Sequence, residues 1–177
     1  MKKKFNDVYT ECRDSVYGYL LYMTKDVQLA EDLSQETFLR IFLGLGRFKG
    51  DSKVKTWALK IARNVFMSYA RKKRPILLEE QELFQRKETA VGAPEELILQ
   101  REEGTKIQQL LMTLNEQERT ILLLRDYEEL SYEEIASILE INVGMTKSRL
   151  YRARQKFKKL YDVMDEQERK NDHGREN

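Results

Sequence analysis

The sequence predicts an all-α protein of two small helical domains joined by a linker, the second containing a helix-turn-helix. Three observations support this fold class. Helix-favouring Leu, Glu, Lys, Arg and Gln dominate the chain, whereas only eight Gly and two Pro interrupt it. Apolar residues recur at the three- and four-residue spacing of amphipathic helices. The 177 residues, 41% of them hydrophobic, suffice for two small cores.

The first domain, residues 1–75, is predicted to contain three helices. An apolar stripe from Phe5 to Met23 indicates the first. The second follows Asp26, whose side chain is of a type that commonly caps a helix, and ends at Gly44 and Gly46.

A loop over residues 48–52 separates the second helix from the third. The apolar stripe of the third helix begins at Val54 and includes Trp57, for which a core position is favoured over stacking on an exposed base. We expect this helix to stop at Arg74, because Pro75 disfavours helical geometry in the residue before it.

Helical periodicity fades over residues 76–94, where the composition turns acidic, and we interpret this stretch as an interdomain linker. The tail, residues 166–177, is almost wholly polar and is expected to be disordered.

The second domain covers residues 95–165. Two capping boxes open helices in it: Asn115 with Glu118, and Ser131 with Glu134. A turn around residues 142–144 separates the short helix that follows the second box from a longer helix that runs to about Met164. Two helices joined by such a turn form a helix-turn-helix unit.

Positive charge is concentrated in two segments, although the net charge is only +2. Residues 52–78 and 142–161 contain no Asp or Glu but hold eight and seven Lys or Arg, respectively. One interpretation is that both segments are simply helix faces exposed to solvent. Two basic strips on separate domains are also what a two-point contact with a phosphate backbone requires, and we favour nucleic acid as the partner.

The long helix of the second domain places different side chains for different contacts. Those facing away from its apolar side, near the helix start, are positioned to reach base edges in a major groove: Ser148, Tyr151, Arg152 and Gln155. Flanking cations are assigned to phosphates: Lys147, Arg149 and Arg154.

Two polar faces are predicted in the first domain. On the third helix, one lies opposite the apolar stripe and beside the loop: Thr56, Lys60, Arg63, Asn64 and Met67. On the second helix, a stripe of alternating charge has no obvious affinity for DNA: Asp32, Gln35, Glu36 and Arg40. Periodicity alone favours simple solvated surface for this stripe over a partner-binding face.

The sequence offers no support for an enzyme. No Gly-Lys-Ser/Thr follows the glycines around Gly44 to form a phosphate loop. One Cys, Cys12, and one His, His173, cannot build a zinc site, so we expect no catalytic residue, metal, cofactor or small-molecule substrate. A signal peptide and an apolar run near the roughly 20 residues of a membrane span are both missing, which predicts a cytoplasmic protein.

Four segments together resemble the extracytoplasmic-function sigma factors of the sigma-70 family. They span most of the chain in the family's order: Asp26–Phe38 (DVQLAEDLSQETF), Phe48–Asn64 (FKGDSKVKTWALKIARN), Leu130–Ala136 (LSYEEIA) and Val143–Arg154 (VGMTKSRLYRAR). One such segment is weak, but four in this order at these separations are highly specific.

The resemblance implies that residues 1–75 open and read a minus-ten element and that residues 95–165 read a minus-thirty-five element as duplex. It also assigns one set of residues to the clamp helices of core RNA polymerase, overturning the solvated-surface reading: Asp32, Gln35, Glu36, Phe38 and Arg40. Another set is expected to hold a base flipped from the melted non-template strand: Phe48, Lys49, Gly50, Asp51, Ser52, Lys60, Arg63 and Asn64.

The family likeness further implies contact with the polymerase flap, an anti-sigma factor that is commonly membrane-anchored, and a stress or envelope regulon. The recognition turn departs from the usual pattern, because Asn142 stands where Pro is common and Met145-Thr146 replaces Thr-Val. A capping role for Asn142 would preserve the fold. The alternatives are a stand-alone helix-turn-helix repressor or activator and a purely helical adaptor.

Overall fold

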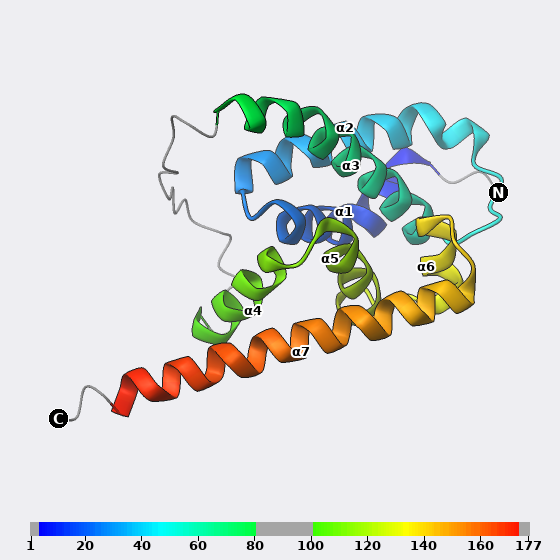
Figure 1. Ribbon diagram of the computed structural model, residues 1–177. Helices are drawn as coiled ribbons and strands as arrows, with labels where there is room; N and C mark the ends of the chain where they lie inside the picture. The colour runs from blue at the N-terminus through cyan, green and yellow to red at the C-terminus, as the bar shows by residue number, and fades with distance from the viewer. Residues whose placement is uncertain (1–3, 81–100, 174–177) are drawn as a thin grey trace. The chain divides into compact units, whose positions relative to one another are not determined.

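The computed structural model describes residues 4–80 and 101–173 (Figure 1). In these residues all regular secondary structure is helical, and there is no strand. The chain divides into two compact units, Met1–Leu99 and Gln100–Asn177. The predicted all-α class is therefore confirmed. Residues 81–94 of the expected linker lie outside the described residues, as does the end of the tail beyond residue 173.

The first unit packs three helices around one core. They are α1 (Phe5–Thr24), α2 (Val27–Gly44) and α3 (Val54–Glu80), with the short 3₁₀ helix η1 (Leu45–Arg47) after α2. Each of the three helices contacts the other two. The largest fully buried apolar side chains come from all three helices: Tyr19, Leu20, Met23, Ile41 and Leu59. The predicted stripe of α1 thus forms much of this core.

The junction between α1 and α2 is fixed by local backbone chemistry. Lys25 adopts a left-handed conformation (φ 54°) and its N–H bonds to the carbonyl of Leu21 at 2.8 Å, which ends α1. The carboxylate of Asp26 then accepts from the N–H of Leu29 at 3.0 Å. The predicted N-cap is confirmed.

The expected stop of α3 at Arg74 is wrong, because the helix continues through Pro75 to Glu80. Proline fixes φ near −65°, which suits a helix, although it removes its own N–H from the hydrogen-bond ladder and its ring crowds the carbonyl four residues earlier. The bias against helix in the preceding residue was therefore not sufficient to end α3.

The second unit contains α4 (Arg101–Thr113), α5 (Glu116–Leu122), the π-helical turn η3 (Leu123–Tyr127), α6 (Tyr132–Leu139) and α7 (Val143–His173). Both predicted capping boxes are present. Asn115 accepts from the N–H of Glu118 at 2.9 Å, and Ser131 from that of Glu134 at 3.1 Å. Helices α6 and α7 form the predicted helix-turn-helix.

A buried arginine joins α4 to α5. The side chain of Arg119 is 5% exposed, and its Nε donates to the carbonyl of Leu111 at 2.8 Å. One of its terminal nitrogens donates to the carbonyl of Leu114 at 3.0 Å. Leu111 lies in the last turn of α4 and Leu114 just beyond it, where a positive charge is favoured. The carbonyl of Leu111 also accepts from the N–H of Leu114 at 3.2 Å.

Helix α7 is longer than predicted at both ends. It begins at Val143, so Gly144 is helical rather than part of the turn, and the Asn142 side chain caps it by accepting from the N–H of Met145 at 2.7 Å. It also continues past Met164 to His173, so the expectation of disorder from residue 166 is wrong for the described part of the tail.

An ion-pair group links the continued part of α7 to α4. Lys106 of α4 binds Asp165 at 3.2 Å and Glu168 at 2.8 Å, and its ammonium lies 4.7 Å from the ring centroid of Tyr161. Arg169 adds a further pair to Asp165 at 2.9 Å. Composition alone predicted disorder because it does not register these contacts between α4 and α7.

Over the described residues, no helix is both long and apolar enough to cross a membrane.

Candidate nucleic-acid interface

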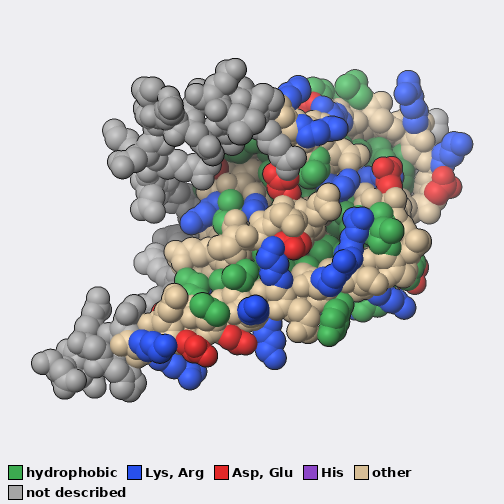
Figure 2. Space-filling model, in the orientation of Figure 1, with side chains coloured by type: hydrophobic (Ala, Val, Ile, Leu, Met, Phe, Trp, Pro, Cys, Tyr) green, Lys and Arg blue, Asp and Glu red, His purple; other side chains and the backbone are tan. Residues whose placement is uncertain are grey.

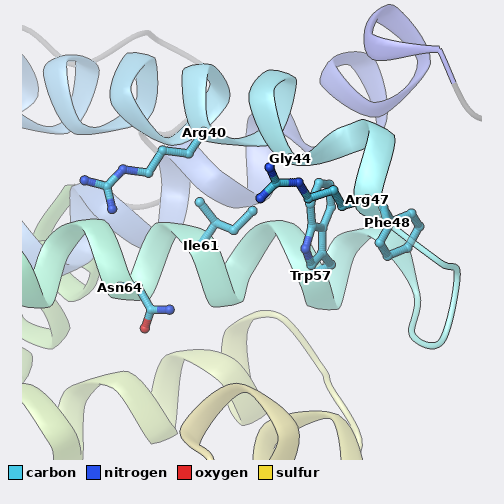
Figure 3. Close-up of a pocket in the computed structure, with 7 residues that line it drawn as sticks. All are labelled: Arg40, Gly44, Arg47, Phe48, Trp57, Ile61 and Asn64. Carbon is cyan, nitrogen blue, oxygen red and sulfur yellow. The ribbon is translucent and has the colours of Figure 1, made fainter.

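A pocket of about 350 Å³ lies between the end of α2 and the first half of α3 (Figure 3). Residues of α2, η1 and the following loop line one side, and residues of α3 line the other. The lining residues are Arg40, Gly44, Arg47, Phe48, Trp57, Ile61 and Asn64. The pocket therefore combines apolar and aromatic surface with two arginines and one amide, which suits a flat, partly polar, anionic ligand.

The aromatic wall of the pocket consists of Phe48 and Trp57. Their rings are stacked, with centroids 4.7 Å apart and planes inclined by 29°. Trp57 is half-buried rather than in the core, so the favoured core interpretation holds for only part of its ring. The stack ties the loop after η1 to α3.

Polar groups lie around this wall. Asn64 is exposed on α3, and a terminal nitrogen of Arg63 lies 3.4 Å from its side-chain oxygen. Arg40 and Arg47 bring two guanidinium groups from the opposite side (Figure 3). Arg40 is paired with Glu36 at 2.7 Å, one turn earlier on α2. The pocket rim is thus positively charged.

Of the residues predicted to hold a flipped base, only Phe48 and Asn64 line the pocket. The remaining ones lie in the adjoining loop or on α3 without lining it: Lys49, Gly50, Asp51, Ser52, Lys60 and Arg63. Gly50 has φ +78°, a conformation that favours glycine and turns the loop. Thr56, predicted on the polar face of α3, is instead 2% exposed.

The polymerase-binding residues predicted on α2 fall into different environments. Asp32 and Gln35 are exposed, and Arg40 reaches the pocket. Phe38 is 8% exposed and packs edge-on against Tyr9, with centroids 4.7 Å apart. Phe38 is therefore packed in the core of the first unit.

Sequence reasoning missed an apolar patch beside this stripe. Leu39, Phe42 and Leu43 are 54%, 59% and 70% exposed. Phe42 meets the ring of Phe5 at 5.3 Å in an edge-on contact. Three adjoining large apolar side chains left exposed on one helix end are typical of a protein-binding surface.

The exposed face of α7 carries the side chains predicted to reach base edges. Ser148, Arg152 and Gln155 are exposed, and Tyr151 is 66% exposed. Opposite them, Leu150 and Ala153 are buried, as the apolar phase predicts. The helix therefore presents a polar face next to its N-terminal end.

The flanking cations of α7 are engaged within the unit. Arg154 forms a two-point ion pair with Asp126 of η3, and hydrogen bonding to this carboxylate is the main cause that raises the pKa of Arg154. Lys156 binds Glu118 at 2.8 Å. Arg149 is half-buried. Figure 2 shows acidic side chains beside basic ones over the C-terminal part of α7.

Tyr132, the first residue of α6, lies between two cations. The guanidinium of Arg125 is 4.7 Å from its ring centroid and the ammonium of Lys147 is 5.3 Å from it. Arg125 also donates to the carbonyl of Leu130 at 2.7 Å. These contacts gather positive charge at the start of the helix-turn-helix, where a phosphate backbone passes in such units.

Nothing among the described residues forms a group of three or more side chains suited to a metal ion.

Comparison with known proteins finds one family match in each of the two units. The profile described as Sigma-70 region 2 matches residues 8–76, and that described as Sigma-70, region 4 matches residues 104–157. RNA polymerase sigma factor YlaC of Bacillus subtilis is 31% identical over 171 residues, covering 95% of this chain and 98% of its own. ECF RNA polymerase sigma factor SigM of the same organism is 36% identical over 158 residues, covering 89% and 94%.

A solved structure agrees with these matches. The sigma factor RpoE, in complex with the anti-sigma factor NepR from Bartonella quintana, superposes with a TM-score of 0.74 at 25% identity. The match covers 90% of this chain and 97% of that one.

Regions 2 and 4 on two helical units define the class of a sigma-70-type transcription initiation factor. The chain belongs to the extracytoplasmic-function sigma factors of this family. It directs RNA polymerase in transcription initiation and is a non-enzymatic subunit of that enzyme. The alternatives of a stand-alone repressor or activator and of an adaptor are set aside.

Proposed function

We propose that the pocket between α2 and α3 holds one base flipped from the melted non-template strand of a minus-ten element. The observation that carries this proposal is the shape and chemistry of the pocket. The stacked Phe48 and Trp57 offer an aromatic surface for a base, and the Asn64 amide can donate to and accept from a base edge. Unstacking a base costs a few kcal/mol, which such a pocket offsets.

The phosphates beside this base meet the positive rim. Arg40 and Arg47 line the pocket, and Lys60 and Arg63 lie on α3 between Trp57 and Asn64. Arginine can bind phosphate oxygens through two donors at once. Residues 1–75 thereby serve as the domain that melts and reads the minus-ten element, with residues 49–52 completing the pocket entrance.

The second unit reads duplex DNA at a minus-thirty-five element. Its predicted domain, residues 95–165, presents the α7 face of Ser148, Tyr151, Arg152 and Gln155 to a major groove. Lys147, Arg149 and Arg154 lie beside that face and contact phosphates. Residues 76–94 tether this domain to the first.

Core polymerase binds the exposed side of α2 through its clamp helices. Asp32, Gln35 and Glu36 supply the polar contacts, and the apolar patch of Leu39, Phe42 and Leu43 supplies area that loses water on binding. The polymerase flap contacts the second unit.

An anti-sigma factor, membrane-anchored, holds the cytoplasmic protein inactive until a stress or envelope signal arrives. The complex of a relative with its anti-sigma factor NepR supports such a partner. The apolar patch on α2 is a suitable surface, because an inhibitor that covers it excludes polymerase.

Run-off transcription with core polymerase and the full chain tests the proposal for the pocket. We expect Asn64→Ala to reduce open-complex formation at least tenfold on a native promoter, whereas Asn6→Ala, an equally exposed amide on α1, leaves it unchanged. Equal activity of both variants would refute the base-binding role of Asn64.

A second assay tests the helix-turn-helix. Gln155→Ala is expected to weaken recognition of the minus-thirty-five element, and Gln167→Ala, an exposed glutamine farther along α7, to have no effect. Promoter retention in a filter-binding assay of the assembled holoenzyme measures both. Equal retention by the two variants would contradict the assignment.

A further inference from the structure

Gly44, the last residue of α2, is a glycine that the backbone does not require. Its φ of −89° and ψ of −14° are right-handed and accessible to any residue. Glycine in a helix is less favourable than alanine because it loses more conformational freedom on folding. Some other constraint must therefore explain a glycine at this position.

The constraint is the limited space between Gly44 and Trp57. A Cβ added at Gly44 would lie 3.3 Å from Cζ2 and 3.8 Å from Cη2 of Trp57. The first distance is shorter than ordinary contact between carbon atoms, so the indole would have to shift. Two neighbouring glycines differ: Gly46 meets nothing within 4 Å, and Gly50 has a positive φ of 78°.

The indole of Trp57, which lies beside Gly44, is part of the aromatic wall of the pocket. Trp57 stacks on Phe48, and Gly44, Trp57 and Phe48 all line the cavity (Figure 3). Displacement of the indole edge therefore moves one ring of the stack. Because Gly44 has no side chain, the indole of Trp57 can lie close to α2. This position of the indole sets the place of the aromatic wall and the width of the pocket.

We infer that Gly44 determines the size of the base that the pocket accepts. This inference rests on the proposed function of the pocket and makes Gly44 a positioning residue that acts through Trp57. The pocket is open to solvent, and its volume of about 350 Å³ leaves room for a two-ring purine as well as for a one-ring pyrimidine. A methyl group at Gly44 displaces the indole edge and narrows the pocket, which disfavours a two-ring base more than a one-ring base.

The test measures how holoenzyme binds single-stranded DNA. The full chain is assembled with core polymerase, and fluorescence anisotropy is recorded with labelled oligonucleotides of a non-template promoter strand. An abasic scan first identifies the nucleotide whose base is bound in the pocket. All four bases are then placed at that position.

The unmodified protein is expected to bind a purine there at least as tightly as a pyrimidine. Gly44→Ala should lose about tenfold or more in affinity for purines but less than about threefold for pyrimidines, because a misplaced methyl group in a tight pocket discriminates to this degree. Gly46→Ala is the matched control and should change none of the four affinities. Equal losses for all bases, or a Gly44→Ala profile like that of Gly46→Ala, would overturn the inference.

A second substitution separates pocket width from a general disturbance. Trp57→Phe removes the ring atoms that the methyl group would meet, so the double variant Gly44→Ala with Trp57→Phe should recover purine binding relative to Gly44→Ala alone. The unfolding temperature of Gly44→Ala is recorded beside the affinities, because alanine favours the helix whereas its contact with the indole opposes packing. Failure of the double variant to recover purine binding would contradict the inference even if Gly44→Ala proves unstable.

The outcome also distinguishes this inference from the function on which it rests. If abasic positions and Asn64→Ala leave binding by the unmodified protein unchanged, the pocket holds no base and both proposals fail. If both reduce binding while Gly44→Ala behaves as Gly46→Ala does, only the role of Gly44 fails.

Discussion

Arg154 of α7 donates two hydrogen bonds to the carboxylate of Asp126 in η3. The pair fixes the π-helical turn to the recognition helix at a point 28 residues away along the chain. Both side chains are 46% exposed, so solvent screens the pair and its contribution is modest.

A double-mutant cycle of Asp126→Ala and Arg154→Ala should give a coupling of about 0.5 kcal/mol in the free energy of unfolding. Urea denaturation of the four proteins measures it. The coupling should shrink in 1 M salt, because screening weakens exposed charge pairs. A coupling that is absent at low salt would show that the pair does not hold α7.

Arg152 and Lys147 are expected to differ in how they bind DNA. Arg152→Ala should cost about 1–3 kcal/mol on the correct minus-thirty-five sequence and relax preference at one base pair. Lys147→Ala should weaken all sequences alike and lower the slope of log affinity against log salt by about one. Titrations of holoenzyme with matched and mismatched promoters separate the two effects, and identical profiles would contradict the division between base and phosphate contacts.

Removal of the Arg119 side chain should destabilise the second unit. Arg119→Ala removes the buried donor of the carbonyls of Leu111 and Leu114, of which Leu111 keeps the N–H of Leu114, and is expected to cost about 1–3 kcal/mol of unfolding free energy. Arg13→Ala is the control, since Arg13 is exposed on α1 and should change stability by less than about 0.5 kcal/mol. A similar urea midpoint for both variants would rule out a structural role for Arg119.

The Lys106 ion pairs predict a loss of stability in alkali. The hydrogen bond to Glu168, followed by the contacts with Asp165, holds the pKa of Lys106 above its ordinary value of 10.5. Because the folded pKa is the higher one, the stabilisation is complete below pH 10.5 and is lost as the pH rises through the folded pKa.

The unfolding temperature of the unmodified protein should therefore fall more steeply above about pH 10.5 than that of Lys106→Met, which keeps the apolar stem beside Tyr161. Lys158→Met, at an exposed position on α7, should follow the unmodified protein. Thermal melts recorded by circular dichroism between neutral pH and strong alkali provide the comparison, and parallel curves for all three proteins would exclude the effect.

Local rules predicted the helices well where the signal lies within a few residues. The N-cap at Asp26 and the boxes at Asn115 and Ser131 depend on side chains that bond backbone three residues away, and all are present. The prediction was wrong at Pro75 and beyond residue 165, where continuation of a helix depends on its tolerance of one lost hydrogen bond or on ion pairs with a distant helix.

The pocket was only partly predictable. Motif resemblance identified Phe48 and Asn64, because these residue types stand in fixed segments of the sequence. Arg47 and Ile61 were not identified, and Arg40 was placed at the polymerase surface, because helical phase does not reveal which side chains of two helices meet across a cavity. The sequence marks Gly44 only as a helix stop, since its contact with Trp57 is visible only in three dimensions.

The left-handed conformation of Lys25 at the end of α1 recurs at Glu129 and Glu140, with φ values of 56° and 57°. At each of these three positions the side chain makes the left-handed conformation less favourable than it would be for glycine, by about 1 kcal/mol of conformational free energy. Glycine at these turns should therefore yield a more heat-resistant protein whose promoter preferences are untouched, a convenient starting material for crystallising the initiation complex.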